Sequence, residues 1–100
     1  MSQLSLQIAA DHPTGAGHFP GNPIIPGALL LAEVLRCIEQ AEGVHCSAYN
    51  IKTVKFLRPA RPGDRVEIEY GRSAQGTIEF QCSIAGIKVL SGAVSATIDA

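Results

Sequence analysis

The sequence is poor in the features that mark several large classes of protein. No stretch approaches the roughly 20 apolar residues that a membrane-spanning helix needs, although 46% of the 100 residues are hydrophobic. The N-terminus lacks the basic region followed by an apolar run that marks a secretory signal peptide. We therefore expect a cytoplasmic protein with no membrane partner.

Cysteine is scarce. Cys37, Cys46 and Cys82 are odd in number, widely spaced and without a Cys-x-x-Cys pair, so they predict neither a disulfide framework nor a zinc site. A glycine-rich phosphate loop at the end of a strand is also missing. We expect no metal and no organic cofactor, and we interpret the three cysteines as small buried or half-buried thiols.

An overall excess of basic charge is missing too. The formal net charge is −1 and the isoelectric point about 6.3, which argues against the broad basic surface of a nucleic-acid binder. The basic residues are nevertheless unevenly distributed. Between positions 52 and 65 the net charge is +4, because Asp64 is the only acid among five bases, Lys52, Lys55, Arg58, Arg61 and Arg65.

Repeats, linkers and low-complexity tracts are absent, and 100 residues are enough for one domain over positions 1–100 but not for two. Residues 28–42 form the single predicted helix, which is apolar almost all round in its first half and ends at Gly43. Ala85-Gly86 predicts a tight hairpin turn. Apolar alternation and turn residues predict strands near 3–9, 48–57, 64–71, 76–85 and 87–98. This is an α+β layout, and a second copy could extend an open edge of its sheet.

Positions 11–27 hold four glycines and four prolines, which exclude a regular helix and predict a specified loop. Three of the prolines recur every third residue, the period of polyproline II, which implies a stiff and extended passage. The same spacing occurs in peptide ligands of aromatic grooves. The apolar residues Phe19, Ile24 and Ile25 instead favour a buried segment.

Two segments carry a resemblance to a known family. The signature segment, Gly17-His18-Phe19-Pro20-Gly21-x-Pro23-x-x-Pro26-Gly27, resembles the active-site signature of the 3-hydroxyacyl-ACP dehydratases of fatty-acid synthesis, where ACP is the acyl carrier protein. The landmark segment, Lys55-Phe56-x-Arg58-Pro59-x-x-Pro62-Gly63-Asp64, resembles that family's second landmark. The likeness runs from about Asp11 to Ala96, and its start is most similar to the short dehydratase-like proteins of aryl-polyene pathways.

The resemblance implies a hot-dog fold, in which a curved antiparallel sheet of about five strands encloses one central helix. It implies a dimer, formed with a second copy or with a related hot-dog subunit, whose interface holds an acyl tunnel and two active sites. It also implies an enzyme, a lyase that converts 3-hydroxyacyl thioesters of ACP or coenzyme A to trans-2-enoyl thioesters.

This elimination needs a base for the proton on C2, a donor for the departing hydroxyl on C3, and stabilisation of charge on the thioester oxygen. The family uses the histidine at His18 as a catalytic group, and an imidazole with a pKa of about 6.5 can accept a proton at cell pH. Gly27 directly precedes the predicted helix and can offer its N–H to the oxygen at the positive end of the helix dipole. By the resemblance, the Ile24 carbonyl holds the imidazole, and Phe19 and Pro26 complete the substrate-binding set.

A lone histidine in a loop is more often solvated than catalytic, and the signature segment is what singles out His18. His12 and His45 have no such setting, and we interpret them as surface residues.

The resemblance breaks fourteen residues after His18. There the family has an Asp or Glu that reaches across the dimer, whereas this chain has Ala32. Glu33 is the neighbouring candidate for this catalytic group, but one helical step turns a side chain by about 100°. Glu33 is alternatively an i,i+3 partner of Arg36 on the polar stripe of the helix.

Three functions stay open. The chain is an active dehydratase or hydratase that depends mainly on His18, or a catalytically weak subunit that binds acyl chains or ACP and pairs with an active homologue. The third is a thioesterase, against which the signature segment argues. The five bases of the +4 window are candidate docking residues for an acidic carrier protein, or a solvated strand edge that prevents aggregation.

Overall fold

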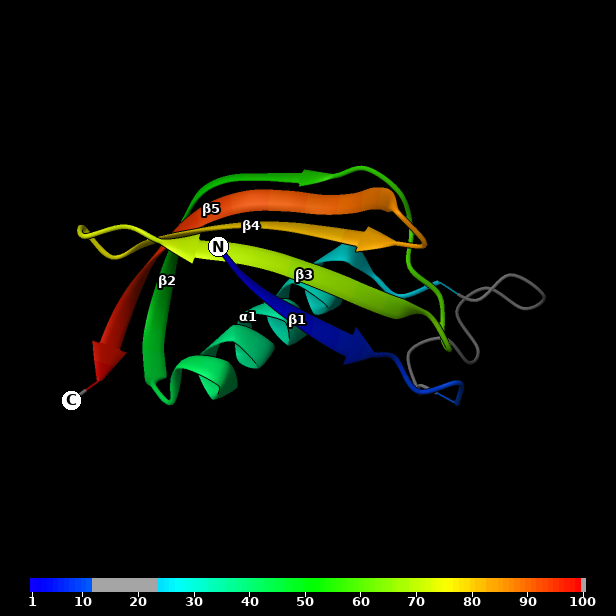
Figure 1. The fold of residues 1–100 in the computed structure, drawn as a ribbon, viewed down its shortest axis with the longest axis horizontal. Coiled ribbons are helices and arrows are strands. Elements are labelled where there is room, and N and C mark those ends of the chain that lie inside the picture. The colour runs from blue at the N-terminus through cyan, green and yellow to red at the C-terminus, as the bar shows by residue number, and fades with distance from the viewer. Residues whose placement is uncertain (12–23, 100) are drawn as a thin grey trace.

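The computed structural model describes residues 1–11 and 24–99, which form one helix packed on one face of a five-stranded antiparallel sheet (Figure 1). The elements are β1 (Ser2–Gln7), α1 (Gly27–Glu42), β2 (His45–Phe56), β3 (Arg65–Arg72), β4 (Thr77–Ile84) and β5 (Ile87–Asp99). The predicted α+β layout is confirmed, and each predicted helix or strand occurs within three residues of its expected bounds.

The strand order is β1-β3-β4-β5-β2, so β1 and β2 are the two edges of the sheet. Each neighbouring pair is antiparallel. The long strands β2 and β5 bend together, so that the sheet curls around the C-terminal end of α1 (Figure 1). Two register shifts in β2, between Cys46 and Ala48 and between Ile51 and Thr53, interrupt the ladder where this bending occurs.

The core lies between α1 and the sheet. The helix contributes residues at the three- and four-residue spacing of one face, and these are Leu30, Leu31, Val34, Leu35 and Ile38. On β3 and β4, alternate residues face the helix and are buried, namely Val66, Ile68, Tyr70, Ile78, Phe80 and Cys82. The apolar alternation in the sequence therefore identified the core-facing side of the sheet.

Two predicted chain reversals have the expected geometry. Gly43 ends α1 in the left-handed conformation at φ 68°, and the N–H groups of Gly43 and Val44 donate to the carbonyls of Gln40 and Glu39 at 3.3 and 3.1 Å. Ala85 and Gly86 both have positive φ, 51° and 81°, as the type I′ turn of a tight hairpin requires.

Candidate active site

The expected base, His18, lies outside the described residues, as do His12 and Phe19. The same holds for most of the loop predicted over positions 11–27. The structure describes the C-terminal end of the signature segment, Ile24 to Gly27, and the whole landmark segment. These two regions lie side by side.

A backbone contact joins them. The N–H of Ile25 donates to the carbonyl of Ala60 at 2.7 Å, in an isolated antiparallel bridge. Both residues are buried, with 2% and 1% of their surface exposed. The bridge therefore holds the start of α1 next to the chain that leaves β2.

Gly27 begins α1 against the ring of Phe56. A Cβ atom at position 27 would lie 2.8 Å from Cδ1 and 2.9 Å from Cε1 of Phe56, well inside the optimum of about 3.5–4.0 Å for non-bonded carbons. The carbonyl of Pro26 accepts the N–H groups of Leu29 and Leu30, each at 3.0 Å. The N–H of Gly27 belongs to the first turn, where a helix offers no carbonyl of its own as partner.

These residues line a shallow pocket of about 250 Å³, which we call the signature pocket. Its lining consists of Ile24, Ile25, Pro26, Gly27, Leu30, Phe56, Leu57, Arg58, Pro59 and Ala60. The walls are apolar except for Arg58 and backbone groups, as a site for an acyl thioester requires. Three of the expected substrate-binding residues, Ile24, Pro26 and Gly27, are therefore brought together here.

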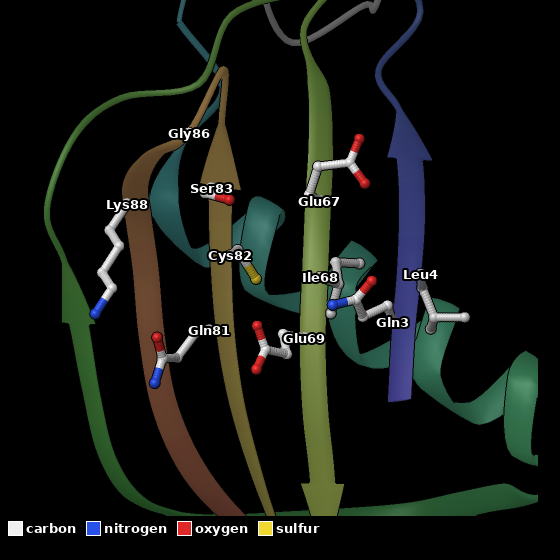
Figure 2. A pocket seen from close by; sticks show the side chains of 10 residues that line it. All are labelled: Gln3, Leu4, Glu67, Ile68, Glu69, Gln81, Cys82, Ser83, Gly86 and Lys88. Carbon is white, nitrogen blue, oxygen red and sulfur yellow. The ribbon is translucent and has the colours of Figure 1, made fainter. Parts of the chain in front are cut away.

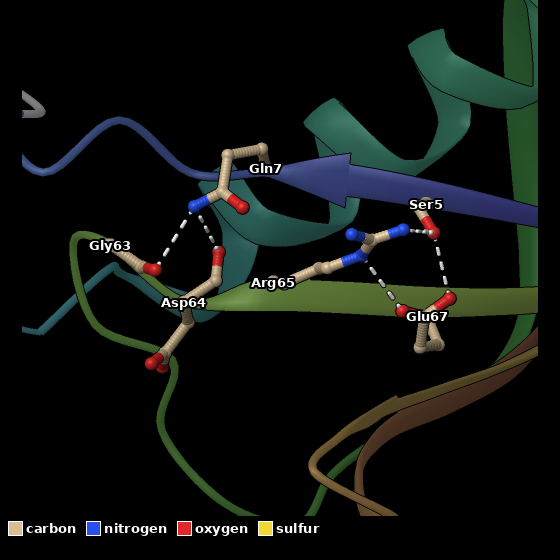
Figure 3. Close-up of polar contacts among 6 residues, drawn as sticks. All are labelled: Ser5, Gln7, Gly63, Asp64, Arg65 and Glu67. Atoms are coloured by element: carbon tan, nitrogen blue, oxygen red, sulfur yellow. Dashed lines mark hydrogen bonds and ion pairs between the residues drawn. The ribbon is translucent and has the colours of Figure 1, made fainter.

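The end of the landmark segment forms a turn that contacts the end of β1. Gly63 has φ 90° and donates its N–H to the carbonyl of Ile8 at 3.0 Å, and the side chain of Gln7 donates to the carbonyl of Gly63 at 3.0 Å (Figure 3). The carboxylate of Asp64 accepts the backbone N–H of Arg61 at 2.8 Å. Pro-Gly-Asp thus ties the start of β3 to the end of β1, a scaffolding role that the sequence reasoning missed.

Ala32, at the family's carboxylate position, and its neighbour Glu33 do not line the signature pocket. Ala32 is exposed on α1. Glu33 is half-buried in a pocket of about 280 Å³ between α1 and β1, together with Gln7 and Arg36. That pocket and the signature pocket have no lining residue in common. Within one chain, Glu33 therefore does not line the pocket that contains Gly27.

The five bases of the +4 window occupy different surroundings. Arg65 donates to Glu67 at 3.0 Å and to Ser5 at 3.2 Å (Figure 3). Lys52 donates to the hydroxyl of Thr77 at 3.1 Å. Lys55 lines a surface depression that also contains Glu79. Arg58 belongs to the signature pocket, and Arg61 is exposed in the loop beyond it.

Another depression, of about 370 Å³, lies on the face of the sheet that is turned away from α1 (Figure 2). Its lining includes Glu67, Glu69, Gln81 and Lys88. Exposed carboxylates, amides and a lysine are the usual content of a solvated sheet face. We therefore assign the candidate site to the signature pocket.

The thiols are structural in the way that the sequence suggested. Cys82 is buried, and Cys37 and Cys46 are half-buried. Burial raises the pKa of Cys82 to about 12 and also raises the pKa of Cys37, which keeps both thiols protonated and unreactive. Among the described residues, no three His, Cys, Asp or Glu side chains are grouped to hold a metal ion. No helix in residues 1–11 and 24–99 combines the length and apolar character of a membrane span.

The chain has curated relatives among the dehydratases. The 3-hydroxyacyl-(acyl-carrier-protein) dehydratase FabZ of Rhizobium rhizogenes is 35% identical over 88 residues, covering 75% of this chain and 54% of the relative. FabZ of Levilactobacillus brevis is 36% identical over 88 residues, covering 77% and 59%. The chain thus spans about half the length of the curated relatives that it matches.

Solved structures with this fold include an uncharacterised protein from Erwinia carotovora subsp. atroseptica, at TM-score 0.77 and 27% identity, covering 96% of this chain and 82% of that one. The dehydratase heterocomplex ApeI:P from Xenorhabdus doucetiae matches with TM-score 0.76 and 21% identity, covering 95% of this chain and 85% of that one. A mutant of the fluoroacetyl-CoA-specific thioesterase FlK matches with TM-score 0.72 and 10% identity, covering 99% of this chain and 88% of that one. These likenesses confirm the predicted hot-dog fold. Because the family model described as ApeI dehydratase matches residues 1–93, the chain belongs to the ApeI-like dehydratase family.

Proposed function

We propose that residues 1–100 form a single hot-dog domain that dehydrates 3-hydroxyacyl thioesters to trans-2-enoyl thioesters in acyl-chain synthesis. The observation that supports this most directly is the bridge from Ile25 to Ala60, which gathers the end of the signature segment, the start of α1 and the landmark segment around one pocket. The names of the curated relatives specify an acyl carrier protein, so we propose a carrier-bound substrate.

In the proposed reaction, His18 takes a proton from C2 and the C2–C3 double bond forms as the C3–O bond breaks. The hydroxyl leaves with the electron pair and, once protonated, departs as water. The N–H of Gly27, at the positive end of the α1 dipole, holds the charge that develops on the thioester oxygen. The carbonyl of Ile24 orients the imidazole, and Phe19 and Pro26 contact the acyl group. The mechanism requires no metal or organic cofactor.

The group that protonates the leaving hydroxyl is proposed to be Glu33 or a carboxylate of a partner subunit. Glu33 lines the pocket beside β1 and shares no lining residue with the signature pocket, which favours the partner's carboxylate. Losing such an acid typically costs about 10²–10⁴ in rate without abolishing turnover.

The second candidate function is therefore that of a weak or silent subunit that binds acyl chains and pairs with an active homologue. The exposed Ala32 at the family's carboxylate position supports it. A protein of the same fold occurs in a dehydratase heterocomplex. We propose that pairing uses the open edge at β2, because Ile51 and Leu57 are 55% and 50% exposed there and a second sheet would cover them.

Carrier docking is proposed to depend mainly on Arg58 and Arg61, with Lys52, Lys55 and Arg65 adding long-range attraction. Arg58 lines the pocket itself, whereas Arg65 and Lys52 already donate to Glu67 and Thr77. We expect Arg58→Glu to lower carrier-linked kcat/KM at low salt more than Arg65→Glu does. Equal effects from both variants would indicate a diffuse charge contribution instead of docking at the pocket.

The deciding experiment incubates the purified protein with a 3-hydroxyacyl thioester of ACP and follows enoyl product and free thiol separately. We expect enoyl product that disappears in His18→Ala and persists in His45→Ala, a matched change at an exposed histidine that pairs with Asp99. Free thiol in place of enoyl product would indicate a thioesterase. Activity that appears only when a related subunit is added would establish the second candidate function.

The missing acid can be tested in the same assay. We expect Ala32→Asp to raise the dehydration rate by about tenfold or more, because it restores a carboxylate at the family's position. Glu33→Gln should change the rate little if a partner supplies the acid. A large loss in Glu33→Gln, with no gain in Ala32→Asp, would assign the role to Glu33.

A further inference from the structure

The contact between Phe56 and Gly27 constrains the signature pocket beyond what the proposed reaction requires. The ring fills the space where a side chain of residue 27 would stand, within 2.9 Å of the missing Cβ. Yet Phe56 is 53% exposed, so much of the ring remains open toward the pocket and solvent. An aromatic wall therefore stands directly beside the N–H that is proposed to hold the thioester oxygen.

Both sides of this contact are held by backbone hydrogen bonds. Phe56 pairs with Leu90 in the register of β2 and β5, and the next N–H, that of Leu57, donates to the carbonyl of Val89 at 2.9 Å. On the other side, the bridge between Ile25 and Ala60 anchors the chain that leads into Gly27. Because both backbones are fixed, the Phe56 ring can yield to a bulky ligand group only by rotating about its side-chain bonds. That rotation would break the packing of the ring on Gly27.

The position of the ring determines which part of a substrate it meets. A thioester oxygen that accepts the N–H of Gly27 lies about 2.9 Å from that nitrogen. C2 and the thioester sulfur are both bonded to the carbonyl carbon, on opposite sides of the C=O bond. In the orientation that sets C2 on the ring side, C2 lies next to Phe56. A hydrogen on C2 fits beside an aromatic wall, whereas a methyl carbon needs a separation of about 3.5–4.0 Å from the ring carbons.

We propose that Phe56 is the specificity-determining residue at C2 of the substrate. It selects 3-hydroxyacyl thioesters that carry two hydrogens on C2 over those with a methyl branch there. This inference rests on the proposed function for its substrate class, and on the Phe56–Gly27 contact for its selectivity.

The test compares kcat/KM for an unbranched and a 2-methyl-branched 3-hydroxyacyl thioester. Wild type should prefer the unbranched substrate by about tenfold or more, the usual effect of one badly placed methyl group. In Phe56→Ala the ratio should fall to within about threefold, with Phe56→Leu between the two. Ile87→Ala is the matched control, because Ile87 is also half exposed, at 51%, and does not line the pocket. An unchanged ratio in Phe56→Ala would overturn the inference.

A double-mutant comparison tests the contact itself. Gly27→Ala keeps the backbone N–H but places a methyl carbon too close to the Phe56 ring carbons. We therefore expect a loss of kcat/KM of about tenfold or more. In the Phe56→Ala background the same change should cost much less, because the collision is gone. Equal losses in both backgrounds would mean that the ring does not constrain this site.

Binding measurements distinguish failure of the proposed function from failure of this inference about Phe56. Unreactive acyl thioesters that keep the carbonyl oxygen but lack the 3-hydroxyl, with either two hydrogens or a methyl branch on C2, are titrated calorimetrically into wild type, Phe56→Ala and Ile87→Ala. If wild type forms no enoyl product but Phe56 still governs the preference between analogues, the reaction is wrong and the selectivity is right. If wild type turns over and the analogue preference ignores Phe56, the reaction stands and the inference fails.

Discussion

At the scale of single residues, Ala85 has a backbone conformation that its side chain disfavours. It is the residue with positive φ, at 51°, that is not glycine in the described part of the chain. The type I′ turn requires this conformation at both central positions, and Gly86 supplies it freely at the second. An L-residue with a Cβ is disfavoured there by about 1–2 kcal/mol, whereas asparagine tolerates the conformation better.

We therefore expect Ala85→Asn to raise the free energy of unfolding by about 0.5–1 kcal/mol, measured by urea denaturation. Ala74→Asn is the matched control, since Ala74 is exposed in the β3–β4 turn and does not have positive φ. A loss of stability in Ala85→Asn would contradict the turn geometry.

Cys82 is the buried residue with the clearest pH dependence. Burial raises its pKa to about 12, so the unfolded chain releases this proton at lower pH than the folded chain does. Its contribution to stability is therefore complete below the unfolded pKa of about 8.5 and is lost as the pH rises toward 12.

We expect a thiol reagent at pH 8 to modify Cys82 only when the protein unfolds, with half-exposed Cys46 reacting first. Mass spectrometry of the labelled peptides distinguishes the sites. Stability should also fall less between pH 8 and pH 10 in Cys82→Ala than in wild type. Rapid labelling of Cys82 in the native protein would show that the core is open.

At the scale of elements, Gly92 allows β5 to approach its neighbours β2 and β4 closely. A Cβ there would lie 2.7 Å from the carbonyl oxygen of Thr53 and 2.8 Å from Cζ of Phe80. Phe80 lies opposite Gly92 in the β4–β5 register, so the aromatic ring uses the space that glycine leaves. A side chain at position 92 would therefore push β5 away from β2 and β4.

We expect Gly92→Ala to lower the free energy of unfolding by about 1–3 kcal/mol, as overpacking of a filled site does. Gly71→Ala is a suitable control, because its Cβ would lie 3.6 Å from the side chain of Met1, an ordinary contact. Thermal or urea unfolding monitored by circular dichroism measures both variants. Equal effects would show that strand propensity, and not the close approach, explains the change.

At the scale of the whole molecule, the strands of the described residues end in two edges, β1 and β2. The proposed function depends on which edge pairs with a second subunit. The edge strand β2 carries Ile51 and Phe56, and Leu57 follows it directly; all three are at least half exposed. Phe56, the last residue of β2, also forms a wall of the signature pocket. Pairing at β2 would therefore bring a second subunit next to the candidate site.

We expect Ile51→Lys to weaken association by about 10–100-fold, because it removes the burial of one large aliphatic side chain and adds a charge. Light scattering across a concentration series measures the effect. Ile87→Lys, a change at an equally exposed isoleucine at the start of β5, should leave association unchanged. The reverse result would move the interface away from the β2 edge.

The sequence by itself determined the elements and the family. The signals for the helix and the strands are local: apolar alternation, the apolar run of α1, and glycines at the end of the helix and in the hairpin. Each involves a few neighbouring residues, so it can be recognised in the sequence before the fold is known. The signature segment likewise carries the resemblance to the dehydratases, since its glycines, prolines and His18 lie within eleven consecutive residues. For the same reason, the scaffolding role of Gly63 was invisible, because it needs the carbonyl of Ile8 from a distant strand.

Only the tertiary structure decided how these parts meet. It set the ring of Phe56 on Gly27 and put Glu33 in a pocket apart from the signature pocket. It also gave two bases of the +4 window, Arg65 and Lys52, different partners. Each outcome depends on strand register, on the angle at which a helix presents its side chains, and on the approach of segments far apart in the chain. These are properties of long-range packing, which local patterns along a sequence do not encode.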